Sequence, residues 1–147
     1  MKKLKKMPSV KSAMTPFPHS IQMNAPLDIA RKLMREHHIH HLPVTDKTGL
    51  IGIITDRDIK LILGPEFDYP PERELTVEDV YIPNAYIIDL TTPLDHVLVT
   101  MASRHIGSAI VTKKGKLVGV FTHEDACNNF AHFLRDQFPA SGGNEVA

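Results

Sequence analysis

The groups in this sequence best suited to hold a ligand are two motifs in which a threonine precedes an aspartate by three residues. They run from Thr55 to Asp58 and from Thr122 to Asp125. A threonine that ends a strand can cap the next helix, and the aspartate then interacts favourably with the helix dipole, so one interpretation is a capping box. The other is nucleotide binding, because the free N–H groups and the hydroxyl can bind phosphate while the carboxylate binds ribose.

The two motifs occupy equivalent places in an internal repeat. A shift of 67 residues lays Val10–Leu63 on Val77–Phe130 without a gap, and 16 of the 54 aligned pairs are identical. Two copies of one unit imply two half-sites related by an approximate two-fold axis, and a cleft between such copies is a natural ligand site. The repeat therefore favours ligand binding over capping alone.

Length and composition are those of an ordinary globular chain. It has 147 residues, of which 42% are hydrophobic and 23% are charged, and its formal net charge is zero. One copy of about 55 residues is too small for a stable private core, so the copies should pack together. The zero charge argues against nucleic acid or a membrane surface as partner. No segment approaches the ~20 apolar residues of a membrane span, and the single cysteine fits a cytoplasmic location.

Each copy predicts the element order strand, helix, strand, strand, helix. In the first copy these are an extended segment at 16–22, a helix at 26–37, strands at 42–44 and 50–55, and a helix at 56–63. In the second copy the later elements are a helix at 93–104, strands at 109–112 and 117–122, and a helix at 124–137. Asn24 is placed to cap the first helix, with Pro26 in its first turn.

These elements divide the chain into two copies and three connecting or terminal segments. We expect a basic tail at 1–7, a first motif at 8–64, a Pro-rich linker at 65–74, a second motif at 75–138 and a disordered tail at 139–147. The last helix carries an apolar stripe, which fits either core packing or contact with another subunit. Its members are Ala126, Phe130, Phe133, Leu134 and Phe138.

The first copy resembles the CBS domain, which is named after cystathionine β-synthase. The resemblance rests on Pro26-Leu27-Asp28, on His41-Leu42-Pro43-Val44 and on Gly52-Ile-Ile-Thr55-Asp-Arg-Asp58, and it extends over residues 8–135. The second copy is less similar, because Gly107-Ser108-Ala109-Ile110-Val111 lacks the Leu-Pro pair. A tandem pair of this kind is called a Bateman module. The resemblance implies an α+β fold in which two β-α-β-β-α motifs pack through their sheets with pseudo-two-fold symmetry.

The resemblance also implies two clefts that bind AMP, ADP, ATP, S-adenosylmethionine or sometimes NAD as regulatory ligands, not as catalytic cofactors. In such clefts the aspartate holds the ribose and the threonine approaches the phosphates. Carried over, site 1 comprises Thr55, Arg57, Asp58, Tyr81, Tyr86, Ile106, Gly107 and Ser108. Site 2 comprises Thr122, Asp125, Met14, His19, Ile39, His40, His41 and His123. Site 1 is the better equipped for phosphate, because Arg57 supplies a cation where site 2 has Glu124, although protonated histidines would offset that difference.

The histidines at positions 37, 38, 40 and 41 leave three interpretations open: metal ligands, phosphate contacts, or surface and capping residues. The run crosses from a helix end into a strand, so neighbouring side chains diverge, and no cysteine or carboxylate completes a ligand set. We therefore expect no metal. Cys127 lies four residues after His123, but a partly or fully buried structural thiol is the preferred interpretation. No Gly-rich Lys loop or other catalytic constellation is present, so we expect no enzyme.

Together with the absence of a catalytic constellation, the CBS resemblance implies a non-enzymatic adenosine-nucleotide sensor. Ligand binding would favour one packing of the two copies, and an unknown effector protein would respond to that state. The resemblance further implies a homodimer of two such pairs. The alternative function is an interaction scaffold of the same fold whose clefts bind no ligand.

Overall fold

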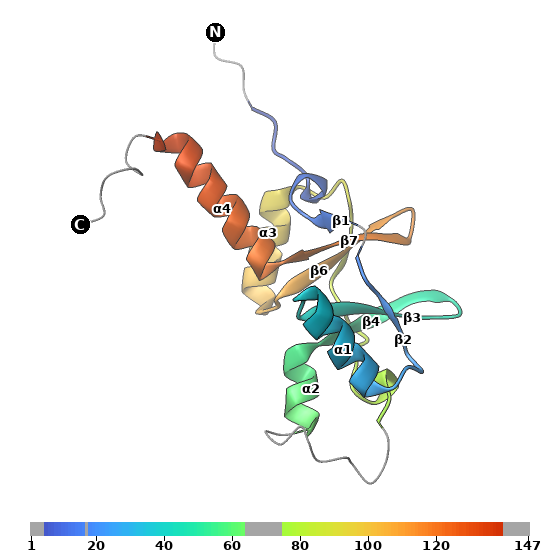
Figure 1. The fold of residues 1–147 in the computed structure, drawn as a ribbon. Helices are drawn as coiled ribbons and strands as arrows, with labels where there is room; N and C mark the ends of the chain where they lie inside the picture. The colour runs from blue at the N-terminus through green and yellow to red at the C-terminus, as the bar shows by residue number, and fades with distance from the viewer. Residues whose placement is uncertain (1–4, 17, 64–74, 140–147) are drawn as a thin grey trace, which may run out of the picture.

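The computed structural model describes residues 5–16, 18–63 and 75–139. The two copies lie against each other, with α1 and α2 beside one sheet and α3 and α4 beside the other (Figure 1). In chain order the elements are η1 (Val10–Ser12), β1 (Thr15–Pro16), β2 (Ile21–Gln22), α1 (Leu27–His37), β3 (His41–Asp46), β4 (Gly49–Thr55), α2 (Asp56–Leu63), η2 (Val77–Asp79), β5 (Ile87–Asp89), α3 (Leu94–Arg104), β6 (Ser108–Lys113), β7 (Lys116–Thr122) and α4 (His123–Gln137). The predicted helices and the hairpin strands are confirmed to within two residues.

Two small sheets form the framework of the fold. One has the strand order β2-β3-β4 and the other the order β1-β7-β6-β5. Within each sheet an antiparallel hairpin pairs with a parallel strand, because a helix connects that strand to the hairpin. The segment at 16–22 is not one strand as predicted. Its start belongs to β1, which pairs with β7 of the second copy, and its end belongs to β2 of the first copy.

The start of each repeat supports the first helix of the other copy. Asn24 does not cap α1, because Pro26 occupies the N-cap and makes no side-chain hydrogen bond. The free N–H of Leu27 instead donates to the carbonyl oxygen of Leu75 at 2.9 Å. In the other copy Leu94 donates to the carbonyl oxygen of Pro8 at the same distance. A backbone carbonyl from the other repeat thus supplies the hydrogen bond that a capping side chain usually provides.

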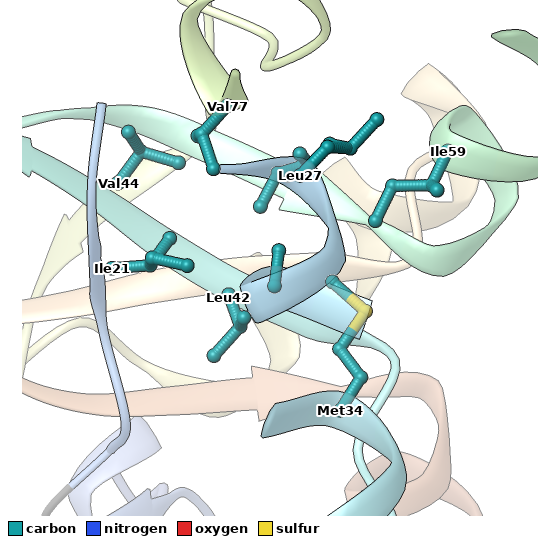
Figure 2. Packing of buried hydrophobic residues seen from close by; sticks show 9 residues of the cluster. Ile21, Leu27, Met34, Leu42, Val44, Ile59 and Val77 are labelled. Carbon is teal, nitrogen blue, oxygen red and sulfur yellow. The ribbon is translucent and has the colours of Figure 1, made fainter. Parts of the chain in front are cut away.

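The hydrophobic cores show the same exchange between copies. Figure 2 shows the first core, in which Val77 of the second repeat packs among residues of the first repeat such as Leu27 and Ile59. In the second core Val10 and Ala13 pack among residues of the second repeat. Val10 and Val77 are both fully buried. Because each core is completed by the other repeat, the two copies are expected to fold as one unit.

Most of the apolar stripe predicted for the last helix is exposed in the structure. Core packing holds only for Ala126, which packs partly buried against the second core, and α4 contains no fully buried residue among those described. The side chain of Phe130 is 61% exposed and that of Phe133 is 56% exposed, and their rings stack with centroids 6.4 Å apart. Figure 1 shows α4 extending away from the sheets, so only its first turns lie near the core. Among the residues that the structure describes, no helix combines the length and apolar character needed to cross a bilayer.

Candidate functional site

Site 1 is a cleft of about 550 Å³ between the two copies. The first copy contributes the end of β4 and the start of α2, which carry Thr55, Arg57 and Asp58. The second copy contributes the segment before β5, with Tyr86, and the junction of α3 with β6, with Ile106, Gly107 and Ser108. The predicted residue that does not line this cleft is Tyr81. Its ring lies beside Gly52 and packs on the first core.

Thr55 and Asp58 are bonded to each other at the start of α2. The Thr55 hydroxyl donates to Oδ2 of Asp58 at 2.5 Å, and the backbone N–H of Asp58 donates to the same hydroxyl at 3.1 Å. This is the geometry of a helix cap. It leaves Oδ1 of Asp58 without a hydrogen-bond partner in the described chain, so this oxygen can accept a hydrogen bond from a sugar hydroxyl.

Two buried polar atoms of site 1 have no partner in the described parts of the protein. They are Nδ1 of His41 and the hydroxyl of Tyr86. Both residues line the cleft, and the guanidinium of Arg104 lies 5.2 Å from the centroid of the Tyr86 ring. Buried polar groups are normally hydrogen-bonded, so an unpartnered pair beside a cleft indicates that a bound molecule or water supplies the partners.

The charges of site 1 lie along α2. Lys60 bonds Asp56 with Nζ 2.9 Å from Oδ2, and Nδ1 of His40 lies 3.5 Å from the same oxygen. Burial would raise the pKa of Asp56, but hydrogen bonds and charges from Lys60 and His40 outweigh burial and hold this pKa below its usual value. Lys60 is therefore paired with Asp56, whereas Arg57 makes no ion pair with any described residue.

Site 2 is a cleft of about 500 Å³ related to site 1 by the repeat. Its predicted members Thr122, Asp125, His19, Ile39, His40, His41 and His123 all line it. Met14 does not. Its thioether packs against the backbone of Gly119, where a β-carbon would collide with the sulfur, and it belongs to the second core. The rings of His19 and His37 stack at this site with centroids 3.7 Å apart.

Asp125 is more firmly held than Asp58. Oδ2 accepts a hydrogen bond from the Thr122 backbone N–H at 3.0 Å, which completes a capping box at α4. Oδ1 accepts a hydrogen bond from the Thr15 hydroxyl at 3.0 Å. Both carboxylate oxygens of Asp125 therefore already have protein partners. In site 1 only Oδ2 of Asp58 has one.

Three histidines, His40, His41 and His123, line both clefts. A β-carbon built on Gly107 would lie 3.2 Å from Cε1 of His41 and 3.6 Å from Cε1 of His123, so both rings approach the same backbone. Burial lowers the pKa of His41, the charges of His40 and His123 lower it further, and Asp58 acts in the opposite direction. The neutral form of His41 is therefore favoured.

Sequence reasoning missed several lining residues. Site 1 also includes Ile82, Asn84, Ala85 and His105, and site 2 also includes Thr15, Pro16, Pro18, His37 and His38. The repeat itself carried part of this signal, because His38 and His105 are equivalent by the 67-residue shift. Each ends a helix in the left-handed conformation, with φ of 53° and 55° respectively, and so turns its side chain toward a cleft.

The interpretations based on metal and thiol chemistry find no support from geometry. Within residues 5–16, 18–63 and 75–139, no group of three or more histidine, cysteine, aspartate or glutamate side chains is arranged to hold a metal ion. Cys127 is exposed, so the expectation of a partly or fully buried thiol is wrong. Its position on α4 beyond the first turn accounts for the exposure, because that part of the helix extends away from the core.

Comparisons with known proteins agree with this geometry. The model of the CBS domain family matches residues 10–64 and 77–132. A CBS domain-containing protein of Dictyostelium discoideum is 32% identical over 142 residues, which are 90% of this chain and 97% of the relative. L-aspartate semialdehyde sulfurtransferase of Methanocaldococcus jannaschii is 31% identical over 82% of this chain, but the match spans 23% of the enzyme. A crystal structure of a CBS domain pair in complex with 5′-methylthioadenosine and S-adenosyl-L-methionine superposes with a TM-score of 0.77 at 28% identity, covering 87% of this chain and 99% of that one.

Proposed function

Because this chain belongs to the CBS domain family, with two such domains in tandem, we propose that it is a regulatory module that binds adenosine-containing small molecules at sites 1 and 2. The main support is the composition of site 1. Thr55 and Asp58 of one copy and Tyr86 and Gly107 of the other line the same cleft of about 550 Å³. Clefts of this size accommodate a nucleoside or nucleotide.

Each part of the cleft suits one part of an adenosine compound. The start of α2 brings the guanidinium of Arg57 to the cleft, where it can bind a phosphate. The free Oδ1 of Asp58 accepts from ribose hydroxyls, and the backbone near Gly107 allows close approach of the base. The unpartnered Tyr86 hydroxyl and His41 Nδ1 supply two further polar contacts. The two ligands in the crystal structure of the similar CBS domain pair are also adenosine compounds.

A ligand that contacts both copies favours the arrangement in which both contact it well, and so couples occupancy to the relative position of the sheets. In our proposal a separate effector protein responds to that change. We further propose that the regulatory unit is a homodimer. The matched catalytic relative contains a domain pair of this kind as only 23% of its length, which agrees with a regulatory role.

The test is a thermal-shift screen of the full chain with AMP, ADP, ATP, S-adenosylmethionine, 5′-methylthioadenosine and NAD, followed by calorimetry on each hit. A ligand at about 100 times its dissociation constant adds roughly 2.7 kcal/mol to the free energy of unfolding, which is a readable shift. Folded protein that was purified free of ligand and responds to none of these compounds would contradict the proposal. It would favour the interaction scaffold instead.

A matched pair of variants tests the site itself. Asp58→Ala should weaken the responding ligand by about tenfold or more, because charge-assisted hydrogen bonds contribute about 1.5–3 kcal/mol. Asp28→Ala is the control, because Asp28 is also an aspartate in the first turn of a helix but lines neither cleft. Equal affinity for Asp58→Ala and Asp28→Ala would exclude site 1, and Asp125→Ala tests site 2 in the same way.

A further inference from the structure

The two clefts share a backbone plan but differ in charge at one helical turn. Arg57 in the first turn of α2 is equivalent by the repeat to Glu124 in the first turn of α4, and both residues line their clefts. One turn further along, Lys60 of site 1 is equivalent to Cys127. The two helices start at equivalent places in the repeat, and this reversal of side-chain charge is the difference between them that bears most directly on an anion.

Site 1 has a cation available for an anionic group. Its lining includes Arg57 and Lys60 together with Asp56 and Asp58. Lys60 is engaged by Asp56 at 2.9 Å. Arg57 is exposed to the cleft and free of ion pairs within the described residues, so a phosphate at the start of α2 would meet a guanidinium that can bind it with two hydrogen bonds.

Site 2 has the opposite character. Glu124 and Asp125 line it, and no lysine or arginine does so among the described residues. The Thr15 hydroxyl and the Thr122 backbone N–H both donate hydrogen bonds to the Asp125 carboxylate at the helix start. A phosphate there would face two carboxylates. The cleft is lined instead by imidazoles, of which His41 is held toward its neutral form by burial.

From this contrast, and resting on the proposed function, we infer that the two clefts sort adenosine compounds by charge. Site 1 binds an adenosine compound that carries phosphate. Site 2 binds one that carries none, such as an uncharged thioether nucleoside or a cationic sulfonium nucleoside. The protein would then report on two chemically distinct adenosine pools at once.

The experiment is calorimetry of the full chain at about pH 8, more than one unit above the ordinary pKa of histidine. The probes are AMP and 5′-methylthioadenosine, and each is titrated into wild type, Asp58→Ala and Asp125→Ala. We expect AMP affinity to fall by about tenfold or more in Asp58→Ala and to change less than about twofold in Asp125→Ala. The methylthioadenosine affinity should show the reverse pattern.

A second experiment exchanges the charges of Arg57 and Glu124, which are equivalent by the repeat. The double variant Asp58→Ala/Glu124→Arg should bind AMP at site 2 about tenfold more tightly than Asp58→Ala alone. Arg57→Glu should weaken AMP at site 1 by a similar factor. Lys116→Glu, an equal charge change at the start of β7 outside both clefts, should leave both affinities unchanged. Since Asp125→Ala removes a cap of α4, Glu124→Gln provides a milder change that keeps the cap, and it should also strengthen AMP at site 2.

Two outcomes would overturn the inference and are distinguishable. If AMP binds both clefts equally well, or Glu124→Arg does not alter AMP binding, sorting by charge is wrong while adenosine binding stands. If wild-type protein binds neither probe nor any other adenosine compound, the proposed function fails and the sorting fails with it.

Discussion

The hydroxyl of Thr15 donates a 3.0 Å hydrogen bond to Oδ1 of Asp125, a residue 110 positions later in the chain. The equivalent position in site 1 is Ile82, which also lines its cleft but has no side-chain donor. The repeat therefore produces two similar turns, of which only the second is connected by a side chain to the exchanged strand of the other copy. This difference separates two sites that otherwise share a backbone plan.

Removing the Thr15 hydroxyl should weaken the packing of β1 on the start of α4. We expect Thr15→Val to lower the free energy of unfolding by about 0.5–1 kcal/mol, the usual net contribution of one exposed hydrogen bond. A double-mutant cycle with Asp125→Ala, which removes the acceptor, should give a coupling energy of similar size in urea denaturation. The reciprocal change Ile82→Thr is a useful companion, because it places a hydroxyl in the cleft that Asp58 also lines. Additive effects of Thr15→Val and Asp125→Ala would show that the bond contributes nothing.

Gly52 in β4 and Gly119 in β7 occupy equivalent positions but should differ in how well they tolerate substitution by alanine. A β-carbon on Gly52 would collide with the carbonyl oxygen of Ile82, whereas one on Gly119 would first meet the flexible thioether of Met14. Backbone cannot move aside as easily as a side-chain end, so overpacking should cost more at Gly52. We expect Gly52→Ala to destabilise by about 2–3 kcal/mol and Gly119→Ala by about 1 kcal/mol in urea denaturation. Equal losses at both positions would contradict this explanation.

His41 should make the protein less stable in mild acid. Its pKa is lowered in the folded state, first by burial and then by the charges of His40 and His123, with Asp58 opposing them. The unfolded state therefore binds the proton more readily, so its contribution to stability is fully present above the ordinary histidine pKa and is lost as pH falls below it. Denaturation at about pH 7.5, 6.5 and 5.5 should show a decline in wild type and a smaller one in His41→Phe. Parallel curves for the two proteins would exclude His41 as the source.

The exposed face of α4 should be covered by a second copy of the chain. Phe130 and Phe133 stack on each other on α4, and Phe138, which caps the end of that helix, is 63% exposed. An apolar surface of this kind is characteristic of an interface. We expect sedimentation of wild type to give a dimer and Phe133→Glu to shift it toward monomer. Val99→Glu on α3, which is 68% exposed, serves as the control and should remain dimeric. A wild-type monomer at micromolar concentration would contradict the prediction.

Most of the fold was predictable from local sequence. Helical and strand periodicity depend on neighbours a few residues apart, so the hairpins and the helices were placed to within two residues. The internal repeat then predicted two equivalent sites, and most of their residues do line a shared cleft. The exposure of α4 was only one of two interpretations, because an amphipathic stripe does not specify whether it packs on the core of its own chain.

What the sequence alone determined was the repeated unit, its element order and the two threonine–aspartate turns, because each of these is a pattern within one short segment. Tertiary structure decided the exchange of strands and the choice between adjacent residues at each cleft. Met14 and Tyr81 were predicted to line the clefts, but their neighbours Thr15 and Ile82 line them instead. Successive side chains of an extended segment point in opposite directions, so the pairing of Thr15 with Val120, far along the chain, fixes which of Met14 and Thr15 faces the cleft.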